Sequence, residues 1–151
     1  MFNIYEARIP TEKEYKTIKK FINNFDVSKT EKEIDKYINE IKLIKDNKVV
    51  SYTKRIYFLR FQYQVVGLLI VSKDLINPGI EFIAVEKAYR KFGGGTYLFE
   101  EAFKILKTNK PAIEVPLDSY LDFKNFITKY EWYTTTFYNK NNNKIFIMNK
   151  F

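Results

Sequence analysis

The order of secondary structure expected along the chain predicts an α+β domain with about seven strands and about four helices. Hydrophobic periodicity and turn residues give the order β-α-α-β-β-β-α-β-α-β-β. A threonine–glutamate capping box precedes each of two segments with helical periodicity, and the uninterrupted apolar run VVGLLIV is typical of a strand covered on both faces. Because the 151 residues contain no linker or internal repeat, we expect residues 1–151 to form one domain.

The N-terminal part of the chain predicts one strand and two amphipathic helices. Phe2–Arg8 alternates loosely and indicates a first strand. Thr11 with Glu14, and Thr30 with Glu33, have the spacing of capping boxes, in which each side chain satisfies a backbone N–H at the helix start. Apolar residues then recur at helical spacing: Tyr15, Ile18 and Ile22 in the first helix, and Ile34, Tyr37, Ile38, Ile41 and Ile44 in the second.

The middle of the chain predicts three consecutive strands. Val49–Phe61 and Val65–Val71 are expected to form a hairpin that turns near Gln62–Gln64. Asn77-Pro78-Gly79 is a turn sequence, and Ile80–Val85, a short apolar run with one charge, follows it as a third strand.

The C-terminal part predicts two helices and three strands. Thr96–Lys107 has Leu98, Ala102, Ile105 and Leu106 at helical spacing. A short strand is expected over Pro111–Pro116, and Asp118 and Ser119 can cap a helix that runs to about Lys129. Two closing strands are expected over Trp132–Phe137 and Lys144–Met148.

The glycine-rich turn Arg90–Gly95, R-K-F-G-G-G, connects a predicted strand to a predicted helix. The free N–H groups of a first helical turn and the helix dipole favour an anion, and glycine lets a phosphate approach the backbone. Two phosphate-binding motifs are excluded. No lysine follows Gly95, as a P-loop requires, and the three consecutive glycines lack the dinucleotide-binding spacing.

The motif R-x-x-G-x-G, placed between this strand and this helix, resembles the acetyl-CoA-binding motif of the GNAT superfamily of N-acetyltransferases. The matching positions are Val85, Tyr89, Arg90, Gly93, Gly95, Leu98 and Ala102. The predicted element order is also the one expected of this family, so the resemblance extends over nearly the whole chain. It implies a three-layer α/β arrangement in which helices flank a mixed central sheet.

The resemblance implies acetyl-CoA as cosubstrate, no metal, and a specific set of binding residues. Backbone amides from Lys91 to Thr96 are expected to cradle the diphosphate, and the pantetheine arm to pair with the strand before them, with the Ile83 amide on the thioester oxygen. Arg90 reaches a phosphate or begins the loop. Phe126 and Lys129 contact the adenosine end, unless Phe126 serves core packing. The cofactor-binding residues are Ile83, Ala84, Val85, Arg90, Lys91, Phe92, Gly93, Gly94, Gly95, Thr96, Phe126 and Lys129.

The residue types that are missing restrict the chemistry. The chain has no histidine and no cysteine, so it has no imidazole base, no Ser–His triad and no thiol nucleophile. Acetyl transfer is therefore expected to proceed by direct attack of an amine on the donor in a ternary complex.

Two catalytic residues are predicted. Glu81 is the only acid inside the strand Ile80–Val85, and strand alternation predicts that it shares a face with Ile83 and Val85. It is a candidate base, and the alternative is an ion-paired or solvent-facing acid. The family's usual tyrosine acid aligns with Ile127 and its glycine with Glu131, so Tyr130 is the candidate substitute, with Tyr120 as another.

The net charge of +8 leaves other partners open. It favours a nucleic acid or a polyanionic cofactor, but the lysines are spread along a chain that is also rich in Asn, Ile, Tyr and Phe. Three functions remain: an N-acetyltransferase for a small-molecule or protein amine, a GNAT-fold acyl-CoA-binding module without activity, and a basic domain acting on nucleic acid or aminoacyl-tRNA. The sequence is compatible with a homodimer. Without a signal peptide, membrane span or cysteine, it predicts a cytoplasmic protein with no membrane partner.

Overall fold

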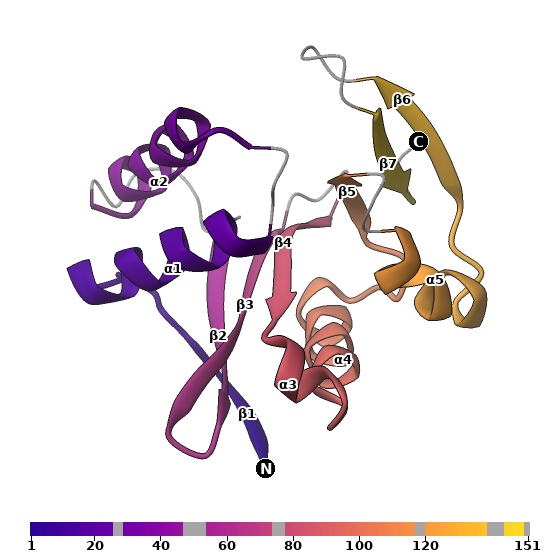
Figure 1. The fold of residues 1–151 in the computed structure, drawn as a ribbon, viewed down its shortest axis with the longest axis horizontal. Helices are drawn as coiled ribbons and strands as arrows, with labels where there is room; N and C mark the ends of the chain where they lie inside the picture. The colour runs from indigo at the N-terminus through magenta and orange to yellow at the C-terminus, as the bar shows by residue number, and fades with distance from the viewer. Residues whose placement is uncertain (26–28, 47–53, 74–77, 117–119, 139–143, 150–151) are drawn as a thin grey trace.

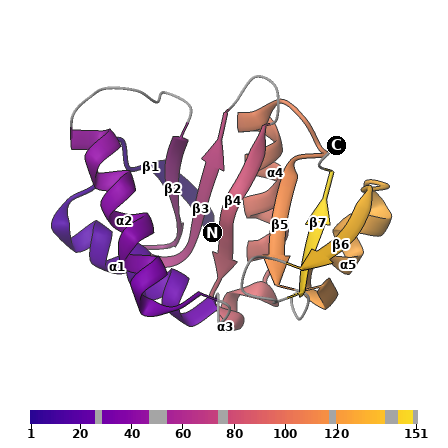
Figure 2. The ribbon, with the colours of Figure 1, turned by 90° about the horizontal axis from the view of Figure 1, so that it is seen from above.

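The computed structural model describes residues 1–25, 29–46, 54–73, 78–116, 120–138 and 144–149, and they form a seven-stranded sheet flanked by helices (Figures 1 and 2). The strands are β1 (Phe2–Glu6), β2 (Lys54–Phe61), β3 (Gln64–Ser72), β4 (Gly79–Val85), β5 (Ala112–Pro116), β6 (Thr134–Tyr138) and β7 (Lys144–Met148). The helices are α1 (Glu12–Phe25), α2 (Glu31–Asp46), α3 (Lys87–Arg90), α4 (Gly94–Leu106) and α5 (Tyr120–Lys129).

The sheet is mixed, as predicted. Its strand order is β1-β2-β3-β4-β5-β7-β6, and every neighbouring pair is antiparallel except β4 and β5, which are parallel. The predicted order of elements is confirmed, with one addition. The four-residue helix α3 lies just before the glycine-rich turn, where the sequence predicted no helix.

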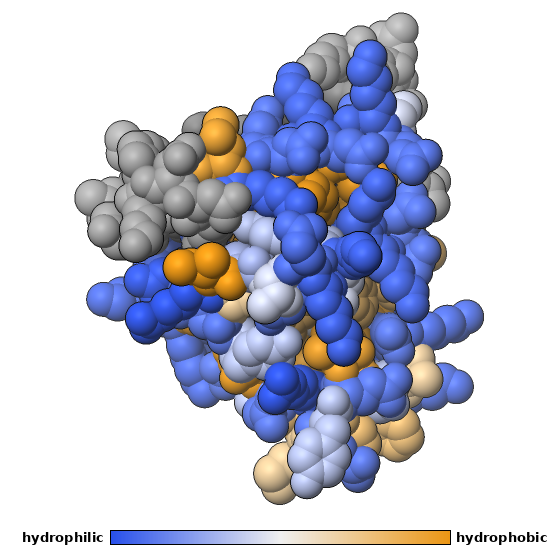
Figure 3. Space-filling view, turned by 90° about the vertical axis from the view of Figure 1, so that its left-hand side faces the viewer, coloured by the Kyte–Doolittle hydropathy of each residue, from blue (hydrophilic) through white to orange (hydrophobic). Residues whose placement is uncertain are grey.

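Two apolar clusters hold the helices against opposite faces of the sheet. One cluster joins α1 and α2 to one face, and the other joins α4 and α5 to the opposite face (Figure 2). The fully or nearly fully buried helix residues are Tyr15, Ile18, Phe21, Ile22, Ile34, Ile38, Ile41, Leu98, Phe99, Ala102, Leu106 and Phe123. The outer surface on the side of α1 and α2 is mostly hydrophilic (Figure 3), as expected for amphipathic helices.

Strand β3 lies at the centre of the sheet, between β2 and β4, and its side chains enter both clusters. Val66, Leu69 and Val71 pack toward α4, whereas Leu68 and Ile70 pack toward α1 and α2. All five side chains have an exposed fraction of 0%. The prediction that the VVGLLIV run is a central strand covered on both faces is therefore confirmed.

Both predicted capping boxes begin helices. The backbone N–H of Thr11 donates to Glu14 Oε1 at 2.9 Å, and the N–H of Glu14 donates to Thr11 Oγ1 at 3.1 Å. At the start of α2 the N–H of Glu33 donates to Thr30 Oγ1 at 3.2 Å. Each bond satisfies an N–H that has no partner within its helix.

Some predicted boundaries differ from the structure. Strand β1 ends at Glu6, two residues before the predicted end. Strand β6 begins at Thr134 because the backbone N–H of Trp132 donates to Ile127 O at 3.0 Å and that of Tyr133 to Asn149 Oδ1 at 3.1 Å. Residues 49–53 of the predicted second strand lie outside the described residues, as do the predicted capping residues 118 and 119.

Replacing Thr11 by alanine is expected to lower the free energy of unfolding by about 1 kcal/mol, because the Glu14 N–H loses its acceptor. Urea denaturation of wild type and Thr11→Ala measures the difference. Thr11→Ser keeps the hydroxyl and is the matched control. Equal stability of all three proteins would show that this bond contributes nothing.

Candidate active site

Strands β4 and β5 are in contact at one end and separated at the other. Their parallel pairing covers two residue pairs, Gly79 with Ala112 and Ile80 with Ile113. A Cβ added to Gly79 would lie 2.7 Å from the carbonyl oxygen of Ala112, so the close contact requires a glycine. Beyond Ile80 the strands diverge, and the second half of β4 has no paired strand on that side among the described residues.

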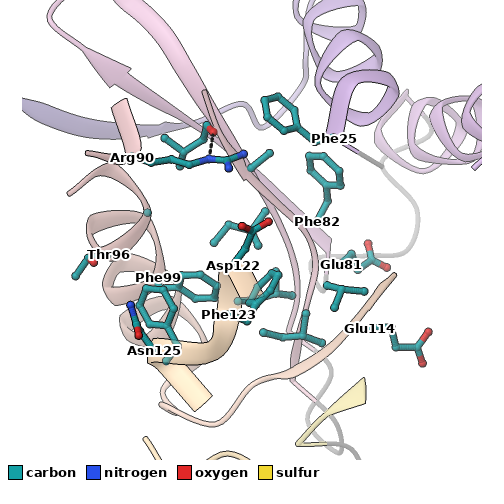
Figure 4. A pocket seen from close by; sticks show the side chains of 18 residues that line it. Phe25, Glu81, Phe82, Arg90, Thr96, Phe99, Glu114, Asp122, Phe123 and Asn125 are labelled. Carbon is teal, nitrogen blue, oxygen red and sulfur yellow. Dashed lines mark hydrogen bonds between the residues drawn. The ribbon is translucent and has the colours of Figure 1, made fainter. Parts of the chain in front are cut away.

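A cavity of about 360 Å³ occupies the gap between the two strands (Figure 4). Phe25 and Phe82 line it from the side of α1 and α2, and Phe99, Phe123 and Phe126 line it from the side of α4 and α5. The cavity therefore reaches both faces of the sheet. Its other lining residues are Ile80, Glu81, Ile83, Ala84, Val85, Arg90, Gly95, Thr96, Ile113, Glu114, Val115, Asp122 and Asn125.

The backbone groups of Ile83 and Val85 point into this gap. The N–H of Glu86 donates to Val66 O at 2.8 Å, so this residue pair is of the hydrogen-bonded type. In an antiparallel ladder hydrogen-bonded and non-hydrogen-bonded pairs alternate. The register pairs Val85 with Gly67 and, two residues earlier, Ile83 with Leu69. The N–H and C=O of both β4 residues therefore face away from β3 and toward β5.

A β-bulge at Glu81 reverses the side-chain alternation predicted for β4. Ile70 pairs with Phe82 and the next residue, Val71, pairs with Ile80, so Glu81 is an extra residue in β4. The expectation that Glu81 shares a face with Ile83 and Val85 is therefore wrong. Its side chain lies on the face covered by α1 and α2.

The Glu81 carboxylate is engaged in two polar interactions. Oε2 accepts a hydrogen bond from the Tyr37 hydroxyl at 3.0 Å and lies 3.0 Å from Lys54 Nζ. Burial raises the pKa of Tyr37, and the neighbouring Glu81 raises it further, so the phenol remains a donor. In Figure 4 the Glu81 side chain points away from the centre of the cavity. Of the two alternatives, the structure shows the ion-paired acid.

The glycine-rich turn presents backbone amides at the start of α4. Gly93 has φ 85° and its N–H donates to Arg90 O at 3.1 Å, while its own carbonyl accepts the first bond of the helix, from Tyr97 N–H at 2.9 Å. The N–H groups between them, those of Gly94, Gly95 and Thr96, have no acceptor within the helix. No side chain caps this end, so the described residues leave these three donors available to an anion.

The three glycines have different roles. A Cβ on Gly94 would meet Tyr89 O at 2.9 Å and Val85 Cγ1 at 3.0 Å, so Gly94 is needed for packing. Glycine is favoured at position 93 by its positive φ, although nothing lies within 4 Å of a Cβ placed there. A Cβ on Gly95 would also point into open space, so at Gly95 the missing side chain leaves room for a ligand.

Arg90 holds the turn against the end of β4. Its Nε donates to Val85 O at 2.8 Å, and the guanidinium carbon lies 5.6 Å from the centre of the Phe25 ring. The remaining guanidinium nitrogens of Arg90 add positive charge at this end of the cavity, and the exposed Lys87 and Lys91 are close in sequence, as is Glu86.

The structure brings only some of the predicted residues to the cavity wall. Eight of the 14 line it: Glu81, Ile83, Ala84, Val85, Arg90, Gly95, Thr96 and Phe126. Gly93 and Gly94 shape the adjoining turn, and Lys91 and Phe92 are exposed on it.

Tyr130 and Lys129 do not line the cavity. The Tyr130 ring packs edge-on against Phe103 at 5.0 Å and stacks with Trp132 at 6.4 Å, and Lys129 Nζ lies 5.3 Å from the same ring. This aromatic packing accounts for Tyr130, and its position does not support the predicted role as an acid.

The sequence prediction missed several polar groups of the cavity. Asp122 and Asn125, on the helix that also supplies Phe126, line it, as does Glu114 on β5. The spacing of Asp122, Asn125 and Phe126 at i, i+3 and i+4 places all three on one face of α5. That spacing is visible in the sequence, but it indicates a cavity only once β5 is known to diverge from β4.

The sequence matches no protein-family model and no curated protein. Solved structures do resemble it. A protein assigned to the GNAT family of acetyltransferases from Desulfovibrio desulfuricans aligns with a TM-score of 0.72 at 10% identity, over 98% of this chain and 97% of that one. Mutant forms of a spermidine/spermine N-acetyltransferase from Vibrio cholerae align at 0.65 and 14% identity, over 97% and 91%.

A GNAT family acetyltransferase from Elizabethkingia anophelis, whose structure has acetyl-CoA bound, aligns with a TM-score of 0.62 at 14% identity, over 97% of this chain and 95% of that one. This protein therefore has the fold of the GNAT acetyltransferases. Among the described residues, no helix is long and apolar enough to cross a membrane, and no cluster of acidic side chains could hold a metal ion.

Gly94→Ala is expected to destabilise the protein by about 1–3 kcal/mol, because the new methyl group meets backbone at 2.9 Å and a packed valine. Gly95→Ala, with open space around its methyl group, is the matched control and is expected to fold with unchanged or slightly increased stability. Thermal unfolding compares the two. The same melting temperature for both variants would contradict the assignment of the packing role to Gly94.

Proposed function

We propose that this protein transfers an acetyl group from acetyl-CoA to an amine by direct attack in a ternary complex. The observation that carries the proposal is the gap between β4 and β5, which opens beside unpaired backbone groups and ends at free helix amides. A long ligand with a peptide-like arm and an anionic end fits this combination, because the arm can pair with β4 as an added strand would.

In this proposal the diphosphate of coenzyme A binds the amides of Gly94, Gly95 and Thr96. The positive end of the α4 dipole and the side chains of Arg90 and Lys91 favour its negative charge. Phe126 contributes apolar surface on the α5 side of the cavity. The structural neighbour from Elizabethkingia anophelis, which has acetyl-CoA bound, supports this choice of cosubstrate.

The Ile83 N–H is proposed to bind the thioester oxygen. It faces the gap, and a backbone donor fixed in a sheet needs no reorganisation when negative charge develops on that oxygen. The chain itself supplies this donor, and no histidine or cysteine is required for it.

The acceptor is proposed to enter from the face covered by α1 and α2. Phe25, which ends α1, and Phe82 line the cavity on that face. An aromatic ring attracts a protonated amine, and because the Phe25 ring already faces the Arg90 guanidinium, Phe82 is the ring proposed to receive it. The spermidine/spermine N-acetyltransferase among the structural neighbours agrees with an amine acceptor, although its particular substrates are those of that protein. The neighbours favour neither an inactive binding module nor a nucleic-acid-binding domain.

Acetyl-CoA is expected to raise the melting temperature of the wild type, and a concentration of 100 times the Kd corresponds to about 2.7 kcal/mol of stabilisation. Gly95→Val is expected to remove this effect, because its side chain occupies the space in front of the helix amides. Thr128→Val, an exposed change on α5 away from the cavity, is the control. No stabilisation of the wild type would contradict the proposal, and full stabilisation of Gly95→Val would place the diphosphate elsewhere.

Glu81→Gln is expected to leave the acetyl-CoA affinity unchanged and to alter turnover by less than about threefold, because the carboxylate is held by Lys54 and Tyr37. The lost ion pair is partly exposed and contributes at most about 1 kcal/mol to stability. Steady-state rates with spermidine as the probe amine, measured between about pH 6 and about pH 9, check this expectation. A fall in kcat of about 100-fold would instead identify Glu81 as the base.

A further inference from the structure

Direct transfer needs a group that moves a proton from the attacking nitrogen to the departing sulfur, and the family's usual tyrosine is missing. The aligned residue, Ile127, is apolar, packs against the core cluster and does not line the cavity. Tyr130 lies in the aromatic cluster described above. Another side chain of the cavity wall is therefore a candidate for carrying the proton.

Four charged side chains line the cavity: Glu81, Arg90, Glu114 and Asp122. Glu81 is paired with Lys54, and Arg90 donates to Val85 O. In Figure 4 Glu81 and Glu114 point away from the centre of the cavity, whereas the Asp122 carboxylate points into it. Asp122 makes no ion pair or hydrogen bond with the described part of the chain.

The helix α5 presents Asp122 beside an apolar wall. Phe99 and Phe123 pack edge-to-face with ring centres 5.6 Å apart, and Phe99 and Phe126 have ring centres 4.3 Å apart. A pantetheine arm in the gap would displace water from the space between this wall and β4. With water excluded, a proton that leaves the attacking nitrogen needs an acceptor on the cavity wall, and a carboxylate can accept it.

We propose that Asp122 is the catalytic residue that carries this proton, an inference that rests on the proposed acetyl transfer. The neutral amine attacks the thioester carbon, and the C–S bond breaks as the amide C–N bond forms. The Asp122 carboxylate takes one proton from the nitrogen and gives it to the thiolate sulfur. Asp122 is then again ionised, and the products are the acetylated amine and coenzyme A.

The ionisation of bound coenzyme A tests this role without an identified acceptor. A thiolate absorbs in the ultraviolet, so its ionisation can be followed by absorbance during a pH titration. The protein saturated with coenzyme A is the sample, and the protein saturated with the coenzyme A analogue that lacks sulfur is the reference. Subtracting the reference removes the absorbance change of the tyrosines. A carboxylate beside the sulfur disfavours the thiolate, so the thiol pKa is expected to be about one unit above that of free coenzyme A. Asp122→Asn removes the shift and Asp122→Glu retains most of it. Glu114→Gln, another acid of the wall, leaves it unchanged.

Turnover gives an independent readout. With spermidine as the probe amine, Asp122→Asn is expected to lower kcat about 100-fold while the KM for acetyl-CoA stays the same. Because Asp122 is exposed on α5, the variant is expected to keep the melting temperature of the wild type.

The possible outcomes separate this inference from the proposed function. If calorimetry detects no acetyl-CoA binding to the wild type, the proposed function fails and this inference fails with it. If acetyl-CoA binds but the thiol pKa is the same in wild type and Asp122→Asn, only the role of Asp122 is overturned, whether or not spermidine is acetylated. A rise in the KM for spermidine with unchanged kcat would also overturn it, since Asp122 would then serve binding alone.

Discussion

The candidate site depends on one close contact, that between Gly79 of β4 and Ala112 of β5. Strands β4 and β5 pair over only two residue pairs and then diverge. Beyond that point the backbone groups of β4 on this side have no partner strand in the described part of the chain. Unpaired buried backbone groups are costly, so a ligand or water must satisfy them. The Ile83 N–H and C=O that face the gap are therefore a binding edge produced by the sheet itself, whereas the Val85 carbonyl already accepts a hydrogen bond from Arg90 Nε. Any larger residue at 79 would meet the Ala112 carbonyl and change the point at which the strands separate.

The bulge at Glu81 and the divergence of the strands act on the same short segment. Without the bulge, the side chains of Ile80 and Val85 would lie on opposite faces, and β4 could not contribute both to the α4 and α5 cluster. The extra residue is polar, and Tyr37 and Lys54 hold its carboxylate on the other face. We therefore propose that Glu81, although it lines the candidate site, stabilises the fold and takes no part in the reaction.

Much of the fold could be predicted from the sequence because it depends on local patterns. The capping box of Thr11 and Glu14 begins α1, and the VVGLLIV run forms β3. The turn around Gly93 could be recognised because a positive φ just before a helix favours glycine, and the glycines stand directly before the helical periodicity in the sequence. The face of β4 on which the Glu81 side chain lies could not be predicted, because it depends on a bulge and the bulge depends on the register with β3. The position of Asp122 at the cavity was missed for a similar reason, because it depends on the distance between two strands that are not adjacent in sequence.

The charged groups around the cavity favour different binding positions for the two substrates of the proposed reaction. The chain carries a net charge of +8, yet three of the four charged side chains on the cavity wall are acidic. The exception, Arg90, lies at the end where the helix amides and Lys91 would meet phosphate groups. A polyanionic cofactor is thus favoured at the α4 end and a cationic amine near Asp122, since Glu81 is paired with Lys54 and Glu114 points away from the centre of the cavity. In the proposed reaction the two substrates would bind different parts of the gap and meet beside Ile83 and Asp122.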